Sequence, residues 1–447
     1  MGSLRARDTL TIGLMLFALF FGAGNLIFPP FLGQQAGSNY WPAILGFVVT
    51  GVGLPLLSVV VISMAKDGIK EIGSRIHPWF AVIFSAAAYL SIGPFFGIPR
   101  SANVAYEMSV KPFIPESGWN STILLAFTVI FFALVYWVCL NPSKMVERIG
   151  SVLTPVLLAA IIILVFGSFF KMEGTLGNVT EKYAASPFVT GFLEGYLTMD
   201  TIAALAFGII VVSAVQQKKA LDRKQIIRET LKAGIIAGIG LSFVYVTIGL
   251  LGAKMAAFGT YDNGGTILTE AAKLMFGVPG MLLLGLIVTL ACFTTAVGLV
   301  AASSQFFSMM LPKIPYKTFT LVITMISLFI ANLGLNQIIS ISVPVLIILY
   351  PVTIVLVVLS FFERFINGSR GVYTGAVFAA MAISIFDGLK TFGVESSFLS
   401  SIFNSLPLYA EGLGWLLPAV AGGLIGFVLD KFVFSKFLKK SLKTASE

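Results

Sequence analysis

Long apolar stretches alternate with short polar breaks from one end of the chain to the other. Crossing the hydrocarbon core of a bilayer takes about 20 mostly apolar residues. About twelve stretches have this length, and each predicts a transmembrane helix. In the first half they cover 10–28, 40–64, 79–99, 121–140, 149–170 and 191–213. In the second half they cover 231–253, 278–311, 318–332, 338–362, 371–386 and 413–434.

The polar stretches between these helices are too short for a separate soluble domain. The longest lie near 100–119, 254–277 and 390–412. We therefore predict one all-α integral membrane domain over residues 1–447. The segment 262–276 has apolar residues at helical spacing, which predicts a short amphipathic helix on the outer surface.

Two of the predicted helices, the first and the sixth, are interrupted. Residues 20–25 place two glycines and an amide inside an apolar span that we expect to end at Pro29, and residues 195–201 place a glycine, two threonines and a carboxylate at membrane depth. Helices one to five and six to ten form two sets of five, so the second set enters the bilayer in the opposite direction. Matching interruptions in such halves are typical of inverted-repeat transporters with a site at the midplane. We predict repeats over about 8–172 and 188–363, followed by two additional helices over about 371–436.

Charged residues make up 11% of the chain, against roughly 25% in soluble domains. With the N-terminus inside, 22 of the 29 Lys and Arg residues fall on inner segments. Such a bias predicts that both termini are cytoplasmic, and it explains the formal charge of +9 without nucleic acid as a partner. The basic run 218–232 is typical of an inner loop, with contact to anionic membrane lipid as the alternative. The outer segments hold the other seven: Arg100, Lys111, Lys171, Lys182, Lys254, Lys273 and Lys390.

Breaking a helix in hydrocarbon frees backbone groups that need partners. We predict that the amides of Gly22, Ala23 and Gly24 face a substrate carboxylate at the start of the second half-helix. The carbonyls of the sixth helix would receive the substrate ammonium, so the pair of breaks suits a zwitterionic amino acid. A glycine-lined packing contact is the alternative interpretation. The substrate-site prediction from the sixth helix comprises Tyr196, Leu197, Thr198 and Met199, and possible walls for the side chain are Phe20, Phe21, Tyr196 and Phe207.

Three polar side chains at the breaks are further candidates. Asn25 follows the first break and is either a cation ligand or a helix cap. Glu194 and Asp200 are possible coupling carboxylates, because a carboxylate at membrane depth is costly. Asp200 is equally suited to cap the second half-helix, and Glu194 lies nearer the outer side.

The eighth predicted helix carries a cluster of neutral oxygens formed by the Ala291 carbonyl and the hydroxyls of Thr294 and Thr295. Sodium binds such oxygens, whereas the alternative is that each hydroxyl bonds a carbonyl one turn back. In the third helix, residues 93–100 combine two glycines and two prolines. They predict a bend near the outer vestibule, or a helix end at which Arg100 pairs with Glu107.

Several classes of function lack support in the sequence. Cys139 and Cys292 fall in apolar helices and the single histidine, His77, has no second ligand nearby, so no metal cofactor is indicated. A nucleophile with its base, and an ATP-binding GxxxxGK[ST] loop, are both missing from the chain. We therefore expect a transporter rather than an enzyme, a channel or an ATP-driven pump, with no cofactor. The first apolar stretch runs into Asn25 and Pro29, so we expect it to be retained rather than cleaved as a signal.

Three motifs give the chain a family resemblance: FGAGNLIFPP at 21–30, GPFFGIPR at 93–100 and EGYLTMD at 194–200. Along nearly its whole length the chain resembles the branched-chain amino acid:cation symporter family, carrier system II or LIVCS, within the amino acid-polyamine-organocation superfamily. The resemblance implies uptake of leucine, isoleucine and valine with sodium or protons across a bacterial cytoplasmic membrane. It also implies the five-plus-five inverted-repeat fold of the bacterial leucine transporter type, with helices one and six broken.

In that wider fold, carbonyls beside the first break and hydroxyls of the eighth helix hold a sodium ion. Matching the Gly-Asn pair of the fold to Gly24-Asn25 implies a sodium site made by Ala18, Phe21, Ala291, Thr294 and Thr295. The Phe-Pro pair that follows comes one residue earlier here than in the fold. Neutral threonine ligands favour sodium as the coupling ion, while Glu194 and Asp200 leave proton coupling open, and exchange of one amino acid for another is also compatible.

Overall fold

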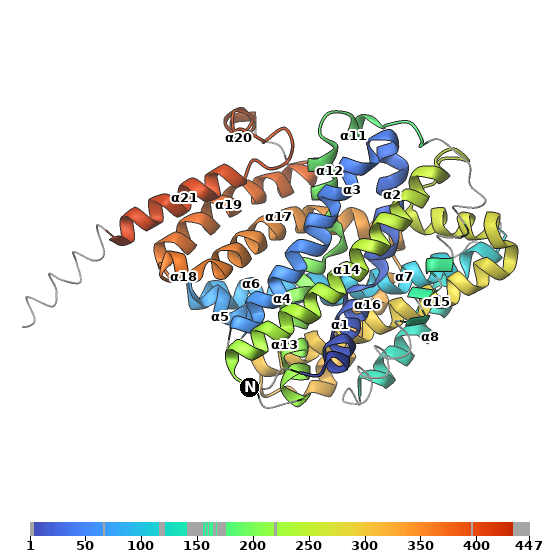
Figure 1. Ribbon diagram of the computed structural model, residues 1–447, viewed down its shortest axis with the longest axis horizontal. Helices are drawn as coiled ribbons and strands as arrows, with labels where there is room; N and C mark the ends of the chain where they lie inside the picture. The colour runs from blue at the N-terminus through green and yellow to red at the C-terminus, as the bar shows by residue number, and fades with distance from the viewer. Residues whose placement is uncertain are drawn as a thin grey trace, which may run out of the picture. The chain divides into compact units, whose positions relative to one another are not determined.

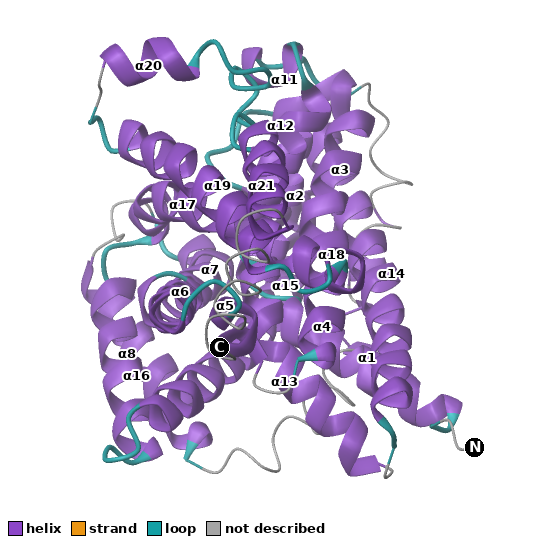
Figure 2. Ribbon diagram, turned by 90° about the vertical axis from the view of Figure 1, so that its left-hand side faces the viewer, coloured by secondary structure: helices purple, strands orange, loops and turns teal. Residues whose placement is uncertain are grey.

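The computed structural model describes residues 4–65, 68–115, 121–140, 176–218, 221–394 and 397–431, with isolated positions between 155 and 167. Within these ranges every regular element is helical (Figure 2). Eight helices in the described part are long and apolar enough to cross a membrane, judged by length and composition, and two shorter apolar helices accompany them. The fifth predicted span, 149–170, lies outside the described residues apart from those isolated positions.

The chain forms two compact units (Figure 1). The first holds residues 1–63 and 89–342, and the second holds 64–88 and 343–447. The first unit contains α1 (Ala6–Phe20), α2 (Ala23–Ala36), α3 (Tyr40–Val48), α4 (Leu54–Met64), α7 (Gly97–Ser109), α8 (Ser121–Cys139), α11 (Glu181–Ala184), α12 (Pro187–Glu194), α13 (Asp200–Lys218), α14 (Arg223–Met255), α15 (Gly264–Met310) and α16 (Tyr316–Ala331). The second contains α5 (Gly68–Ser74), α18 (Glu363–Ile366), α19 (Arg370–Thr391), α20 (Ser397–Phe403) and α21 (Leu416–Leu429), while α6 (Pro78–Leu90) and α17 (Leu335–Phe361) run across the boundary.

Both predicted interruptions are present. The first helix is divided into α1 and α2 at Phe21 and Gly22, and the sixth is divided into α12 and α13 by a 3-10 turn, η8 (Gly195–Thr198), followed by Met199. The third helix is also interrupted, by the π turn η3 (Ser91–Phe95), where Gly93 leaves helical geometry. The predicted bend at 93–100 is therefore confirmed.

The expectation that the first span ends at Pro29 is wrong, because α2 continues to Ala36 with Pro29 and Pro30 inside it. Prolines are tolerated in such helices where a neighbour packs against the backbone they disturb. Here α14 is that neighbour. Glycines let it approach: a Cβ on Gly252 would overlap the Pro30 carbonyl, and a Cβ on Gly33 would overlap that of Gly249.

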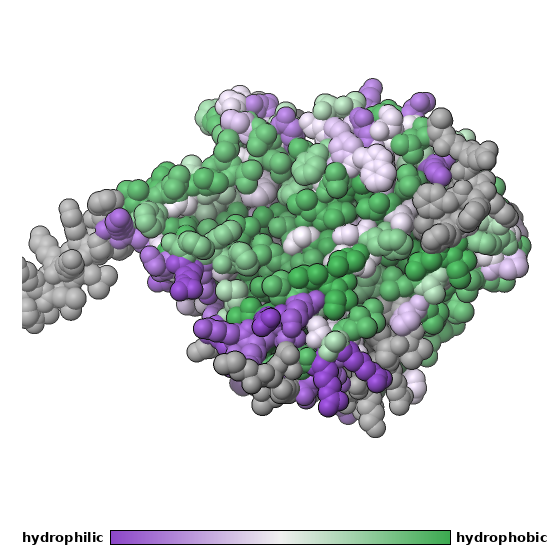
Figure 3. Space-filling model, viewed as in Figure 1, coloured by the Kyte–Doolittle hydropathy of each residue, from purple (hydrophilic) through white to green (hydrophobic). Residues whose placement is uncertain are grey.

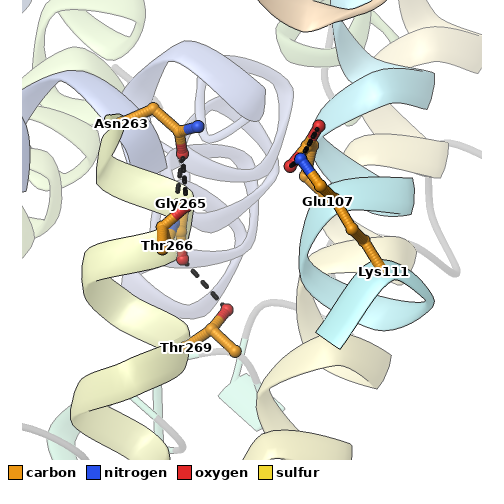
Figure 4. Close-up of polar contacts among 6 residues, drawn as sticks. All are labelled: Glu107, Lys111, Asn263, Gly265, Thr266 and Thr269. Carbon is orange, nitrogen blue, oxygen red and sulfur yellow. Dashed lines mark hydrogen bonds and ion pairs between the residues drawn. The ribbon is translucent and has the colours of Figure 1, made fainter. Parts of the chain in front are cut away.

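The segment after Asp262 forms a helix, as predicted, but joins the eighth span. Asn263 caps α15 by accepting a hydrogen bond from the Thr266 amide at 3.0 Å (Figure 4). The helix continues to Met310, interrupted at Gly277, which has φ +65°. Its first part packs closely on α2, since a Cβ on Gly264 would overlap the Ile27 carbonyl.

Helices α19 and α21 of the second unit pack backbone to backbone. Glycines four residues apart on each helix, Gly371 with Gly375 and Gly422 with Gly426, place a carbonyl of one helix where the other has no side chain. A side chain on any of the four would overlap the facing helix. This small-residue spacing is a common packing device between membrane helices.

The outer face of α14 is apolar, as expected of a helix in contact with lipid. Leu231, Ile235, Ile239 and Phe243 recur at four-residue spacing, and each is 44% to 67% exposed. Figure 3 shows apolar residues over most of this face and hydrophilic ones near the lower ends of α1 and α14. Basic residues in that stretch include Arg223, Lys224 and Arg228.

Candidate functional site

The two breaks lie on one cavity inside the first unit. Side chains and backbone from α1, α2, α7, α13 and α15 line it. The predicted site residues that line it are Gly22, Ala23, Gly24, Asn25, Thr198, Met199, Asp200 and Thr295. Residues more than 170 positions apart in the chain therefore meet at one cavity.

A buried polar cluster joins the two breaks through Asn25, Asp200 and Tyr245. The Asn25 amide donates to the Asp200 carboxylate and to the Tyr245 hydroxyl, and that hydroxyl donates to Asp200 at 3.0 Å. All three residues are at most 3% exposed. The Asn25 oxygen also accepts from the Gly22 amide at 3.1 Å. Asn25 therefore caps α2 and contacts the carboxylate of the sixth helix at once.

Asp200 does not cap the second half-helix with its side chain, which faces Asn25 and Tyr245 instead. The capping hydroxyl belongs to Thr198, which accepts from the Asp200 amide at 3.4 Å. Met199 between them adopts φ +66°, a left-handed conformation that is costly for a non-glycine residue. Such strain persists where the surroundings impose it, and it often marks functional positions.

Arg100 lies in the cavity, which contradicts its predicted place in an outer segment near a vestibule. Its side chain is 3% exposed within α7. The guanidinium donates from Nη1 to the Leu197 carbonyl at 2.6 Å and from Nη2 to the Thr198 carbonyl at 3.2 Å. The predicted pairing with Glu107 is also wrong, since Glu107 pairs with Lys111 at 2.7 Å (Figure 4). The π turn at 91–95 lets the third helix continue, so Arg100 stays inside the candidate span Pro78–Phe113 rather than leaving with a loop.

The oxygens predicted to hold a cation lie near the first break. The Thr295 hydroxyl is 3.4 Å from the Phe21 carbonyl and donates to it. The Thr294 hydroxyl donates to the Ala291 carbonyl in its own helix at 2.8 Å. Ala18 belongs to the last turn of α1, where carbonyls lack a following amide in the helix. The structure brings Thr295 to Phe21, and it bonds Thr294 to Ala291 as the alternative interpretation had it.

Some predicted residues do not line the cavity. Tyr196 packs its ring edge-on against Phe192 at 5.8 Å, and Leu197 contributes its carbonyl to Arg100. Glu194 forms an ion pair with Lys182. Of the possible walls, Phe20 and Phe207 line the cavity with ring centroids 6.0 Å apart, whereas Phe21 stacks on Phe17.

Two residues of the site were not assigned to it from the sequence. Arg100 carried a signal, because a charged residue next to a glycine- and proline-broken span is a candidate for function. Tyr245 carried none, since it is one aromatic residue in the uniformly apolar run of α14. The contacts of its hydroxyl with Asn25 and Asp200 follow from the packing of α14 against α2.

Comparison with known proteins decides the family. The family described as branched-chain amino acid transport protein matches residues 5–433. This chain belongs to that family. It is 45% identical over 433 residues to the branched-chain amino acid permease BraB of Bacillus subtilis (strain 168), covering 96% of this chain and 97% of the relative. It is 43% identical over 434 residues to the branched-chain amino acid transport system 2 carrier protein of Pseudomonas aeruginosa, covering 97% and 98%.

Two solved structures have a similar fold. The nucleobase-cation-symport-1 family transporter Mhp1, closed with bromovinylhydantoin bound, has a TM-score of 0.59 at 15% identity, covering 96% of this chain and 93% of Mhp1. MhsT in complex with L-phenylalanine has a TM-score of 0.58 at 16% identity, covering 96% and 99%. The predicted class, an all-α membrane transporter of the leucine transporter type, is confirmed. The family and these relatives are named as transporters, a permease and a carrier, so this chain is a transporter and not an enzyme. The count of twelve helices and the repeat boundaries stay predictions.

Proposed function

We propose that the protein is a secondary symporter that imports leucine, isoleucine and valine together with sodium by alternating access. The observation that carries the sodium assignment is the contact between the Thr295 hydroxyl and the Phe21 carbonyl at the first break. Two oxygens 3.4 Å apart can both bind an ion at roughly 2.4 Å from each, the distance at which calcium, of similar size, binds oxygen. Ala18, Ala291 and Thr294 complete the proposed set of sodium ligands.

The substrate would lie in the cavity between the two breaks. The amides of Ala23 and Gly24 begin α2, where a helix has no carbonyls for them and the dipole favours a carboxylate. Phe20 and Phe207 would contact the branched side chain. The proposed substrate-binding residues that line this cavity are Gly22, Ala23, Gly24, Asn25, Thr198 and Met199. Tyr196 and Leu197, in the turn beside it, complete the proposed set, and Asp200 and Glu194 are the proposed coupling carboxylates.

The bias of basic residues supports an orientation with both termini in the cytoplasm. In this proposal the protein lies in a bacterial cytoplasmic membrane, in contact with its lipid. Five-plus-five repeats with two additional helices would rock around the fixed midplane site.

Uptake of labelled leucine into proteoliposomes tests the function. We expect an inward sodium gradient to drive accumulation, an equal proton gradient to fail, and excess isoleucine or valine to block uptake. Accumulation driven by protons alone would overturn sodium coupling. If neither gradient concentrates leucine while loaded leucine stimulates its entry, the protein is an exchanger.

The same assay tests the ion site. Removing one neutral ligand with Thr295→Ala should raise the sodium concentration for half-maximal uptake by about tenfold, which corresponds to one lost hydrogen-bond-sized interaction. Thr289→Ala is the matched control, since Thr289 lies in the same helix and bonds its own Gly285 carbonyl. Equal sodium dependence in the two variants would contradict the site.

A further inference from the structure

Arg100 places a guanidinium inside the proposed substrate cavity. The side chain comes from α7 and is almost completely buried in a helix at membrane depth. Charged residues at such depth are costly and tend to mark the path of a substrate or ion. Arginine also differs from lysine in presenting a planar fork that matches a carboxylate with two parallel bonds. The question is what this fork does besides binding carbonyls.

Three neighbours hold the guanidinium in place. The carbonyls of Leu197 and Thr198 accept from its two terminal nitrogens, and the ring of Phe28 lies 5.3 Å from its carbon, at cation–π distance. A Cβ on Gly24 would lie 2.9 Å from Arg100 Nη2. The missing side chain at Gly24 therefore lets the guanidinium lie beside the first turn of α2, where the substrate carboxylate is proposed to bind.

This arrangement changes where the substrate ammonium can bind. The carbonyls predicted to receive it each already accept one hydrogen bond, Leu197 and Thr198 from Arg100 and Met199 from the Ala203 amide at 2.9 Å. The positive charge of Arg100 beside two of them also repels an ammonium group. Asp200 lines the same cavity, and its carboxylate contacts Asn25, another lining residue. One guanidinium and one carboxylate on a single cavity match the two charges of a free amino acid.

We infer that Arg100 binds the substrate carboxylate and that Asp200 binds the substrate ammonium. This inference rests on the proposed function, in which the substrate is an amino acid. The Leu197 and Thr198 carbonyls then orient Arg100, and the α2 amides share the carboxylate with it. If Arg100 only satisfied the carbonyls of the second break, replacing it would change the affinity for every ligand by the same factor.

Ligands that lack one charge separate the two roles. Leucinamide keeps the ammonium and lacks the carboxylate, whereas 4-methylpentanoate keeps the carboxylate and lacks the ammonium. Their affinities are measured by displacement of labelled leucine from the purified full-length protein in sodium. The wild-type protein should prefer leucine over either analogue by about 100-fold, the size of a lost charge-assisted pair.

The variants should lose these preferences selectively. In Arg100→Gln, leucine and leucinamide should bind within about threefold of each other, while 4-methylpentanoate stays disfavoured. In Asp200→Asn the pattern should reverse. Arg7→Gln, a change at an exposed residue of α1, is the control and should keep both preferences.

Each remaining outcome decides the matter. If Arg100→Gln weakens leucine and leucinamide by the same factor, Arg100 is structural and the inference is wrong. If that variant does not fold, Arg100→Lys keeps the charge without the fork and should reduce the preference over leucinamide by about tenfold, with no reduction counting against the inference. A wild-type protein that binds leucine and leucinamide equally refutes the carboxylate role of Arg100 and of the α2 amides while leaving transport of branched-chain amino acids intact, whereas one that binds no branched-chain amino acid overturns both proposals.

Discussion

Two breaks, one between α1 and α2 and one between α12 and α13, free the same kinds of backbone group. Different side chains bind those groups at each break. At the first break the backbone groups bind neutral side chains: Thr295 donates to the Phe21 carbonyl, and Asn25 accepts from the Gly22 amide. At the second break the backbone groups bind a charged side chain, because Arg100 donates to two consecutive carbonyls.

The difference indicates which break exchanges its partners during transport. A hydroxyl can turn from a carbonyl to an ion without leaving a buried charge behind. Arg100 cannot leave its carbonyls at the same low cost, because breaking a buried charged contact is strongly destabilising. We therefore expect the coupling ion to bind and dissociate at the first break, while the second break keeps its geometry throughout the transport cycle.

The largest expected effect comes from the residue where the two breaks touch. A Cβ on Gly24 would lie 2.9 Å from Arg100 Nη2 and 3.1 Å from the Thr198 backbone, so Gly24→Ala should displace the guanidinium. We expect leucine affinity to fall by about 100-fold, the loss that follows a disrupted charged contact of 2–3 kcal/mol. Displacement of labelled leucine measures it.

Gly53→Ala is the control for that change. Gly53 lies in the π turn of the second predicted helix, and a Cβ there meets no heavy atom within 4 Å. Leucine affinity should stay unchanged. Normal affinity in Gly24→Ala would show that the two breaks do not depend on each other.

A smaller effect is expected from the hydroxyl that joins the breaks from α14. Tyr245→Phe removes one acceptor from Asn25 and one donor to Asp200. Leucine affinity should fall by about tenfold, as expected for one buried hydrogen bond. Tyr40→Phe removes a bond of the same kind to the α14 backbone at Val246, away from the cavity. It should lower the melting temperature and leave affinity unchanged, and an equal affinity loss in both variants would contradict a specific role for Tyr245.

The breaks could be located from the sequence because glycines and polar residues inside apolar spans are local signals. The same applies to the glycine spacing of α19 and α21, which is a local pattern in the sequence. The end of α2 could not be found in this way. Pro29 predicts a helix end on its own, and it is the glycine face of α14 that allows the helix to continue.

The side chains that bind the backbone at the two breaks could not all be predicted from the sequence, because they come from helices that are far apart in the chain. The sequence predicts Arg100 in an outer segment, whereas its position in the cavity follows from the π turn that lets the third helix continue into α7. The carboxylate of Asp200 inside an apolar span is a local signal, and the residue is buried at the second break. Its partner Tyr245 became apparent only once the packing of α14 was known.

The smallest effect is expected at Glu194, the other carboxylate of the sixth helix. It pairs with Lys182, whose side chain is 52% exposed, so water screens the pair and its contribution is at most about 1 kcal/mol. Glu194→Gln should therefore leave sodium-driven leucine uptake within about twofold of wild type. Asp200, buried between the two breaks, has no such access to solvent. If Glu194→Gln instead abolishes coupled uptake, the coupling carboxylate lies on the outer side of the second break, and the assignment of that break as a fixed element is wrong.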